Sequence, residues 1–175
     1  WTSFKTRPFS KVPSINSNPY AIFVNMMDTN PLCVDPSLVI NGDRDDFLFG
    51  LKILSKLGSN KVFCCSSPDL TLNLDGLDVT HIKFSGPHPA GLSGTHIHNI
   101  APASMSRVSW SINYQDVIAI GKLFSTGRIC VERVVSLAGP AVEQPSIIRT
   151  RLGANIIENH IKTAKHFSEF EMYGI

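Results

Sequence analysis

Hydrophobic positions along the chain form short apolar runs that alternate with segments of helical spacing. The first run, residues 21–27, ends in a turn cluster at residues 28–31. Three further runs of this kind lie at residues 61–66, 79–85 and 107–112. Strands that are apolar almost throughout are typical of a parallel sheet with helices on both faces. The pattern therefore predicts an α/β fold built on these four strands.

Two segments between the runs have the spacing of amphipathic helices. The first begins at Asp43, which we expect to cap it, and ends before Gly58, which suits the left-handed position after a last turn. Its predicted buried face consists of Phe47, Leu48, Leu51, Leu54 and Leu57. The second helix is predicted over residues 114–126, with Asn113 as its cap and Gly127 as its stop.

Two shorter helices are also expected. One follows Pro36, which is well placed at a first helical position, and the other runs from Ala90 or Ser93 to Ile100. Residues 1–19 are rich in proline, serine and asparagine, so that they predict an extended lead-in to the first strand.

The order of these elements predicts two domains. Strands that alternate with helices indicate a Rossmann-like domain over residues 20–128, with a parallel sheet, helices on both faces and right-handed crossovers. The pattern then changes: residues 129–137 and 146–151 resemble a hairpin, and residues 155–166 a helix that packs across it. We interpret residues 129–175 as a partial β-grasp (SLBB-like) unit.

Composition narrows the classes of function. The formal net charge is +2 and there is no run of five basic residues, so that no nucleic-acid partner is expected. No apolar stretch approaches the roughly 18 residues of a membrane span. The chain starts without a methionine or a signal-peptide pattern, which suggests an internal fragment of a longer protein. Its four cysteines form no C-x-x-C pair, which favours a reducing compartment and buried thiols over cluster ligation.

The densest unusual chemistry lies in residues 85–100, where glycines, prolines and histidines follow the third apolar run. Glycine permits a positive φ and proline fixes φ, so that such a segment has a specified loop shape. Ligands of parallel α/β sheets bind at the carboxyl ends of strands, where this loop is expected. The candidate contact residues are Gly86, His88, Gly91, Gly94, His96 and His98.

A metal site in this loop is the first alternative. His81, His88, His96 and His98 fall close together in the sequence. However, if residues 96–98 are helical, the rings of His96 and His98 point about 200° apart, and no carboxylate lies within the loop. Histidines that bond loop carbonyls or face solvent are therefore the preferred interpretation, and no metal is expected.

Other chemistries are weaker still. The glycine spacing matches neither nucleotide-binding fingerprint, and no Lys or Arg occurs between Lys83 and Arg107, although a generic anion pocket remains open. Ser93 does not stand in a nucleophile elbow, and paired catalytic acids are missing, so that no freestanding enzyme and no catalytic residue is expected. A quinone slot is permitted by the chemistry. Its candidate residues are Leu92, Ile97 and Ile100, with one histidine to polarise a carbonyl oxygen.

Six segments in order carry a resemblance to a known family. They are residues 6–13, 28–32, 86–98, 113–124, 135–140 and 149–154. Together they resemble the NqrA subunit of the sodium-translocating NADH:quinone oxidoreductase, over about residues 4–154. The last twenty residues are less similar to the family pattern.

The resemblance implies a peripheral protein on the cytoplasmic face of the bacterial inner membrane. Its complex oxidises NADH, reduces ubiquinone and exports sodium, and uses FAD, FMN, riboflavin and an iron–sulfur centre. The family is related to the flavin-binding subunit of respiratory complex I, but the glycine-rich flavin motif is absent here, so that no cofactor is expected on this chain. The expected partners are the other subunits, especially a membrane subunit, with ubiquinone as a further candidate.

Two hypotheses follow for the role of the chain. The first is an assembly or quinone-proximal role within this translocase, with the loop of residues 86–98 as the contact surface and no activity of the isolated fragment. The alternative is a flavin- or nucleotide-binding oxidoreductase domain, either degenerate or active.

Overall fold

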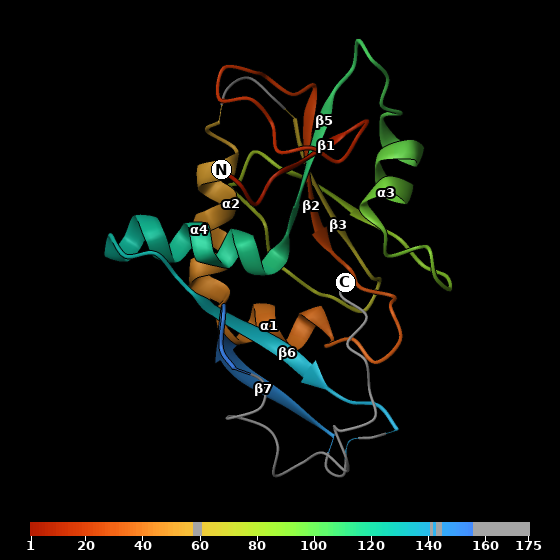
Figure 1. Ribbon diagram of the computed structural model, residues 1–175. Helices are drawn as coiled ribbons and strands as arrows, with labels where there is room; N and C mark the ends of the chain where they lie inside the picture. Colours follow the sequence, from red (N-terminus) through yellow and green to blue (C-terminus); the bar gives the residue numbers. More distant parts are fainter. Residues whose placement is uncertain (58–60, 141, 143–144, 156–175) are drawn as a thin grey trace. The chain divides into compact units, whose positions relative to one another are not determined.

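The computed structural model describes residues 1–57, 61–140, 142 and 145–155. The chain divides into two compact units, of which the first comprises Trp1–Asn30 and Asp35–Cys130. The second combines Pro31–Val34 with the chain from Val131 onward. Figure 1 shows the elements of both units. In the described part of the chain, no helix has the length and apolar character needed to cross a membrane.

The first unit is built on a five-stranded sheet in the order β1-β5-β2-β3-β4. Its strands are β1 (Lys5–Arg7), β2 (Ala21–Met26), β3 (Lys61–Ser66), β4 (Thr80–Lys83) and β5 (Ser109–Asn113). The strands β5, β2, β3 and β4 are parallel, whereas β1 is an antiparallel edge strand. The predicted parallel sheet is confirmed.

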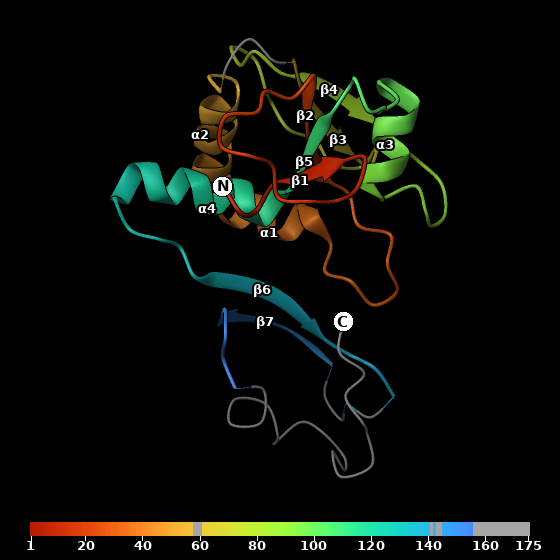
Figure 2. The same cartoon turned by 45° about the horizontal axis from the view of Figure 1, so that its top comes forward.

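Helices cover both faces of this sheet. They are α1 (Pro36–Gly42), α2 (Arg44–Leu54), α3 (Ser93–Ile100) and α4 (Tyr114–Thr126). Figures 1 and 2 show α3 on one side of the sheet and the pair α2 and α4 on the other. On the α3 side, Phe23 and Cys65 of the sheet form a buried cluster with Ile97. Because successive side chains of a strand point to opposite faces, Ile22 and Cys64 point to the α2 and α4 side.

The adjacent cysteines Cys64 and Cys65 therefore serve the packing of two different faces. Neither is exposed. Burial raises the pKa of the Cys64 thiol, with the neighbouring Cys65 as a further cause, and burial raises the pKa of Cys65 to about 12. Two protonated thiols on opposite sides of one strand do not fit the ligand set of an iron–sulfur cluster, which needs thiolates that converge.

The ends of α4 match the sequence prediction. The side chain of Asn113 accepts a hydrogen bond from the Gln115 backbone N–H at 2.9 Å. Gly127 has a φ of 72° and donates its N–H to the Leu123 carbonyl. Asparagine supplies the missing acceptor at the start of the helix, and glycine adopts the left-handed conformation without strain.

Two expectations for α2 are wrong. Asp43 occupies the cap position, but its side chain makes no capping hydrogen bond; its backbone also closes α1, and Oδ1 lies 2.7 Å from Nζ of Lys122 on α4. An ion pair across two helices thus replaces the local cap. Leu57 does not belong to the buried face, because α2 ends at Leu54 and Leu57 is 39% exposed. The expected stop at Gly58 lies outside the described residues.

The strand β1 was not predicted. It lies within residues 1–19 and pairs with β5, while Phe4 before it is buried and Trp1 makes an edge contact with Trp110 at 5.0 Å. A three-residue strand whose outer positions are Lys5 and Arg7 has no apolar run that could reveal it. Aromatic packing, rather than strand propensity, attaches this segment to the sheet.

The second unit contains an antiparallel hairpin of β6 (Glu132–Leu137) and β7 (Ser146–Arg151). Its register pairs Glu132 with Arg151 and Leu137 with Ser146, as expected for two strands joined by the intervening loop. The helix predicted over residues 155–166 lies outside the described residues, apart from its first position.

Candidate functional site at the loop after β4

The loop of residues 85–92 connects β4 to α3, and its position follows from the order of the strands. The chain runs outward from β2 to β3 and β4, and then returns through α3 to β5 on the other side of β2. The direction of the sheet therefore reverses between β2 and β5. At this reversal, Asn25 and Asn113 are register partners at the carboxyl ends of the two strands. Parallel α/β sheets bind ligands at such a point.

The backbone of Gly91 lies against the carboxyl end of β2. Nδ2 of Asn25 donates a hydrogen bond to the Gly91 carbonyl at 2.9 Å, and the Gly91 N–H donates to Oγ1 of Thr29 at 3.1 Å. A Cβ on Gly91 would stand 2.7 Å from both the backbone nitrogen and Oγ1 of Thr29. Only glycine permits this approach. The inner side of the loop is thus fixed to the strand end.

The outer side of the loop is open to solvent. Gly86 and His88 are exposed, and Gly86 has a φ of 124°, which favours glycine. Nδ1 of His88 lies 3.1 Å from Oγ1 of Thr29. Since that oxygen already accepts the Gly91 N–H, its hydroxyl proton is free to donate to His88 Nδ1. In this tautomer His88 carries its own proton on Nε2.

The two helical histidines lie on opposite sides of α3. His96 has no exposed surface; its Nε2 donates to the Ala90 carbonyl at 2.8 Å, and its ring lies 4.3 Å from that of Phe84. His98 is exposed in the last turn. The structure therefore does not bring His88, His96 and His98 together, and no group of three potential metal ligands occurs among the described residues.

The remaining candidates divide in the same way. Gly94 lies against the guanidinium of Arg7, whose Nη2 is 3.3 Å from the place of a Cβ on Gly94. The three residues considered for a quinone slot do not line one cavity: Ile97 belongs to the buried cluster, Ile100 packs against it, and Leu92 is 40% exposed.

Burial makes His96 sensitive to acid. Burial lowers its pKa, and the hydrogen bond to Ala90 opposes this shift only in part. Nδ1 is buried without a partner, so that a second proton would be buried without an acceptor. The neutral ring is the form that the fold stabilises.

We expect the free energy of unfolding to fall as the pH drops below the ordinary pKa of histidine. A depressed pKa means that the unfolded chain takes up the proton first; the contribution is complete above that pH and is lost below it. His96→Gln keeps a donor for Ala90 but cannot titrate. Urea denaturation at neutral and mildly acidic pH should therefore show a flatter dependence for the variant. His81, whose pKa is also lowered by burial and by Lys83, remains in both proteins. An equal slope in the two proteins would contradict this role of His96.

Sequence reasoning missed the partners that fix the loop, namely Asn25, Thr29 and Arg7. A signal existed for two of them: Asn25 is a polar residue inside an apolar strand, and Thr29 follows in the turn cluster. Arg7 and Thr29 also lie in two of the segments that carry the family resemblance, and both segments meet residues 86–98 in the fold.

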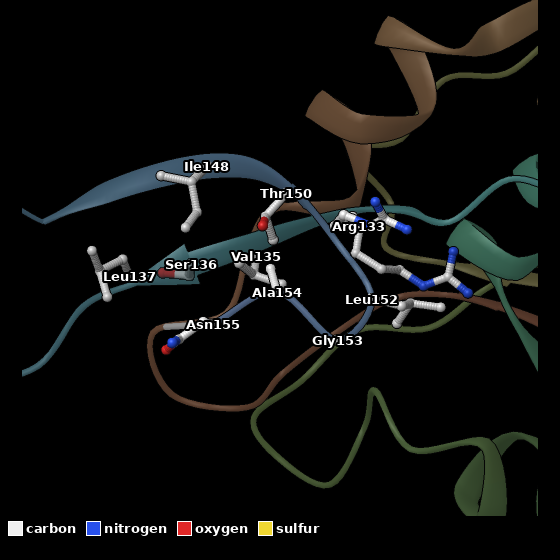
Figure 3. Close-up of a pocket in the computed structure, with 11 residues that line it drawn as sticks. Arg133, Val135, Ser136, Leu137, Ile148, Thr150, Leu152, Gly153, Ala154 and Asn155 are labelled. Atoms are coloured by element: carbon white, nitrogen blue, oxygen red, sulfur yellow. The ribbon is translucent and has the colours of Figure 1, made fainter. Parts of the chain in front are cut away.

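A separate pocket lies within the second unit, on one side of the hairpin (Figure 3). It has a volume of about 380 Å³. Aliphatic residues of β6, β7 and the segment after β7 provide much of its lining, including Val135, Leu137, Ile148, Leu152 and Ala154. The sequence analysis did not identify this pocket. The alternation of β6 and β7 was its only signal.

Two family models match the chain: the NqrA second alpha/beta domain over residues 1–129, and the NQRA C-terminal domain over residues 134–161. Curated relatives also match, and their names give them as the NqrA component of the Na(+)-translocating NADH-quinone reductase. That of Glaesserella parasuis is 55% identical over 161 residues, which are 89% of this chain and 36% of the relative. That of Pasteurella multocida is 51% identical over 172 residues, 95% and 38% of the two chains. That of Vibrio atlanticus is 52% identical over 158 residues, 90% and 35%.

The fold defines a mixed α/β protein with a mostly parallel sheet, four described helices and a following hairpin unit. Because the first family model covers residues 1–129, the chain belongs to the NqrA family. The resemblance found in the sequence is confirmed. The chain spans a little over a third of the length of these relatives.

Proposed function

We propose that the chain is part of the NqrA subunit of a sodium-translocating NADH:quinone reductase, and that its loop of residues 86–98 forms a quinone-proximal or subunit contact surface. One observation carries this proposal. The loop is fixed on its inner side by Asn25 and Thr29, while His88, Leu92 and His98 are exposed on its outer side. A rigid loop with an exposed, chemically varied rim is what a contact surface needs, because little entropy is lost on binding.

The rim has the chemistry for either contact. An imidazole N–H of His88 or His98 could polarise a quinone carbonyl, and Leu92 offers apolar surface. The same groups could instead pack against a neighbouring subunit. The redox groups of the complex are assigned to other parts of it, since the cysteines of the sheet do not converge. In the complex, the chain is placed peripherally, at the cytoplasmic face of the membrane.

The order of the parallel strands supports the proposed kinship with flavin-binding domains. Across the sheet, the third, second, first and fourth parallel strands of the chain follow one another, as in one half of a Rossmann fold. In this chain Gly91 and its neighbours occupy the carboxyl end of the first of these strands. We infer that the domain keeps this architecture and uses the strand ends to hold a loop. The hairpin unit is the start of a β-grasp (SLBB) unit.

The test is a double variant, His88→Ala with His98→Ala, in the intact complex. We expect the KM for ubiquinone, or the half-inhibitory concentration of a quinone-site inhibitor, to change roughly fivefold, as for loss of one or two hydrogen bonds. NADH oxidation by an artificial acceptor should stay unchanged. Asn99→Ala, an exposed substitution on the same helix, is the control. If quinone kinetics and subunit composition both match those of the parent complex, the contact role is wrong.

The alternative function, a flavin- or nucleotide-binding oxidoreductase domain, rests on the same strand order. Its discriminating experiment is the visible absorption spectrum of the purified chain, followed by titration with FMN and NADH. We expect a colourless protein without saturable binding or turnover. A flavin spectrum or a saturable titration would favour the alternative.

A further inference from the structure

Two positively charged groups meet where β1 lies near α3. Nη2 of Arg7 is 3.3 Å from the position of a Cβ on Gly94, in the first turn of α3. Helix N-termini carry a partial positive charge, so that a guanidinium there is repelled unless an anion joins the two. Among the described residues, the Arg7 side chain has no hydrogen bond or ion pair. It is exposed and therefore accessible to a ligand.

The first N–H groups of α3 are open as well. The cap residue is Leu92, which makes no side-chain capping bond. The N–H groups of Thr95 and His96 donate to the Leu92 carbonyl, whereas Ser93 and Gly94 have no such described acceptor. These are the donors that bind anions at helix N-termini.

An independent observation comes from Ser109 on β5. It has no exposed surface, and its Oγ is buried without a hydrogen-bond partner. Buried hydroxyls are normally satisfied, so that an orphaned one indicates a missing ligand.

The register places Ser109 beneath Arg7. The two residues are direct partners in the β1–β5 ladder, and therefore share a face of the sheet. That face is the α3 side, because Ser111, two residues on, is the partner of Phe23, which packs against α3. β5 lies between β1 and β2, so that the Arg7 side chain reaches α3 by crossing the face of β5 that carries Ser109.

We propose that Arg7, the N–H groups of Ser93 and Gly94, and the hydroxyl of Ser109 form a binding site for a phosphate-type oxyanion. Guanidinium presents parallel donors that match two phosphate oxygens, and the serine and the helix end supply further donors. Gly94 provides the space, since a side chain would displace the guanidinium. The oxyanion comes either from free phosphate or from a phospholipid headgroup. The site is independent of the proposed quinone or subunit contact.

The test is calorimetric titration of the 175-residue chain with inorganic phosphate, against chloride at equal ionic strength. We expect one saturable site in the parent chain and about tenfold weaker binding, or more, in Arg7→Gln. Arg44→Gln removes an exposed arginine at the start of another helix and should change nothing. Absence of saturable binding, or equal affinity in Arg7→Gln, would overturn the site.

Two further variants separate binding from folding. Gly94→Ala keeps every charge and favours the helix, but shifts the guanidinium; Ser109→Ala removes only the hydroxyl. Both should keep the circular dichroism of the parent and bind phosphate several-fold more weakly, and unchanged affinity in both would contradict the geometry. Sedimentation with phosphatidylglycerol or phosphatidylcholine vesicles then distinguishes the sources. Arg7-dependent retention by the anionic vesicles alone identifies a headgroup, and phosphate binding without retention identifies the free anion.

Discussion

Gly121→Ala is expected to lower the free energy of unfolding by about 2–3 kcal/mol, the cost of overpacking a close contact. Gly121 of α4 crosses α2 at Asp46, and a Cβ there would overlap the backbone carbonyl of Asp46. A backbone atom cannot move aside as a flexible side chain can, so that the two helices must separate. The loss should outweigh the roughly 1 kcal/mol by which alanine favours a helix over glycine. Urea denaturation of parent and variant measures the difference.

The partner position tests the same crossing from the other helix. A Cβ on Gly50 of α2 would overlap the backbone carbonyl of Val117 on α4, so that Gly50→Ala should be destabilising as well. Gly42→Ala is the matched control, because nothing lies within 4 Å of a Cβ there. A Gly121→Ala protein as stable as the Gly42→Ala protein would show that the helices do not cross so closely.

Gly91→Ala is expected to cost about 2 kcal/mol and to release the loop of residues 85–92. The new Cβ would meet Thr29 at 2.7 Å, which pushes the Gly91 carbonyl and N–H from their bonds with Asn25 and Thr29. Hydrogen exchange should become faster in this loop while the strands keep their protection. An unchanged exchange pattern would contradict the anchoring.

A pair of substitutions at Thr29 separates crowding from hydrogen bonding. Thr29→Val removes the oxygen that serves both Gly91 and His88, and leaves a buried N–H unpaired, at a cost of about 1–3 kcal/mol. Thr29→Ser keeps that oxygen. Valine should therefore reproduce the faster exchange of Gly91→Ala, and serine should not.

The sequence identified the strands and helices of the sheet wherever a local signal existed. Asn113 and Gly127 have the caps that their residue types predict, because capping depends on a few neighbouring dihedral angles. Asp43 has the same kind of local signal, but its carboxylate pairs with Lys122, which is distant in the sequence. A tertiary ion pair cannot be read from local spacing.

The candidate site was predicted in place but not in detail. The glycines and histidines of residues 86–98 marked a loop at a strand end, as found. What they touch depends on the strand order: the return of the chain over β2 brings Gly91 to Thr29, and the unforeseen β1 brings Arg7 to Gly94. His96 and His98 were expected on different sides of a helix, and the structure places one in the core and the other in solvent.

The central claim is that the outer rim of this loop touches another component of the complex. The most direct measurement is photo-cross-linking in the assembled complex from a reactive residue at position 88, with position 45 as the control. Asp45 is equally exposed, on a helix that covers the other face of the sheet. The account predicts that position 88 cross-links to another subunit or to a bound quinone, and that position 45 does so much less. Cross-links from position 45 alone would contradict it.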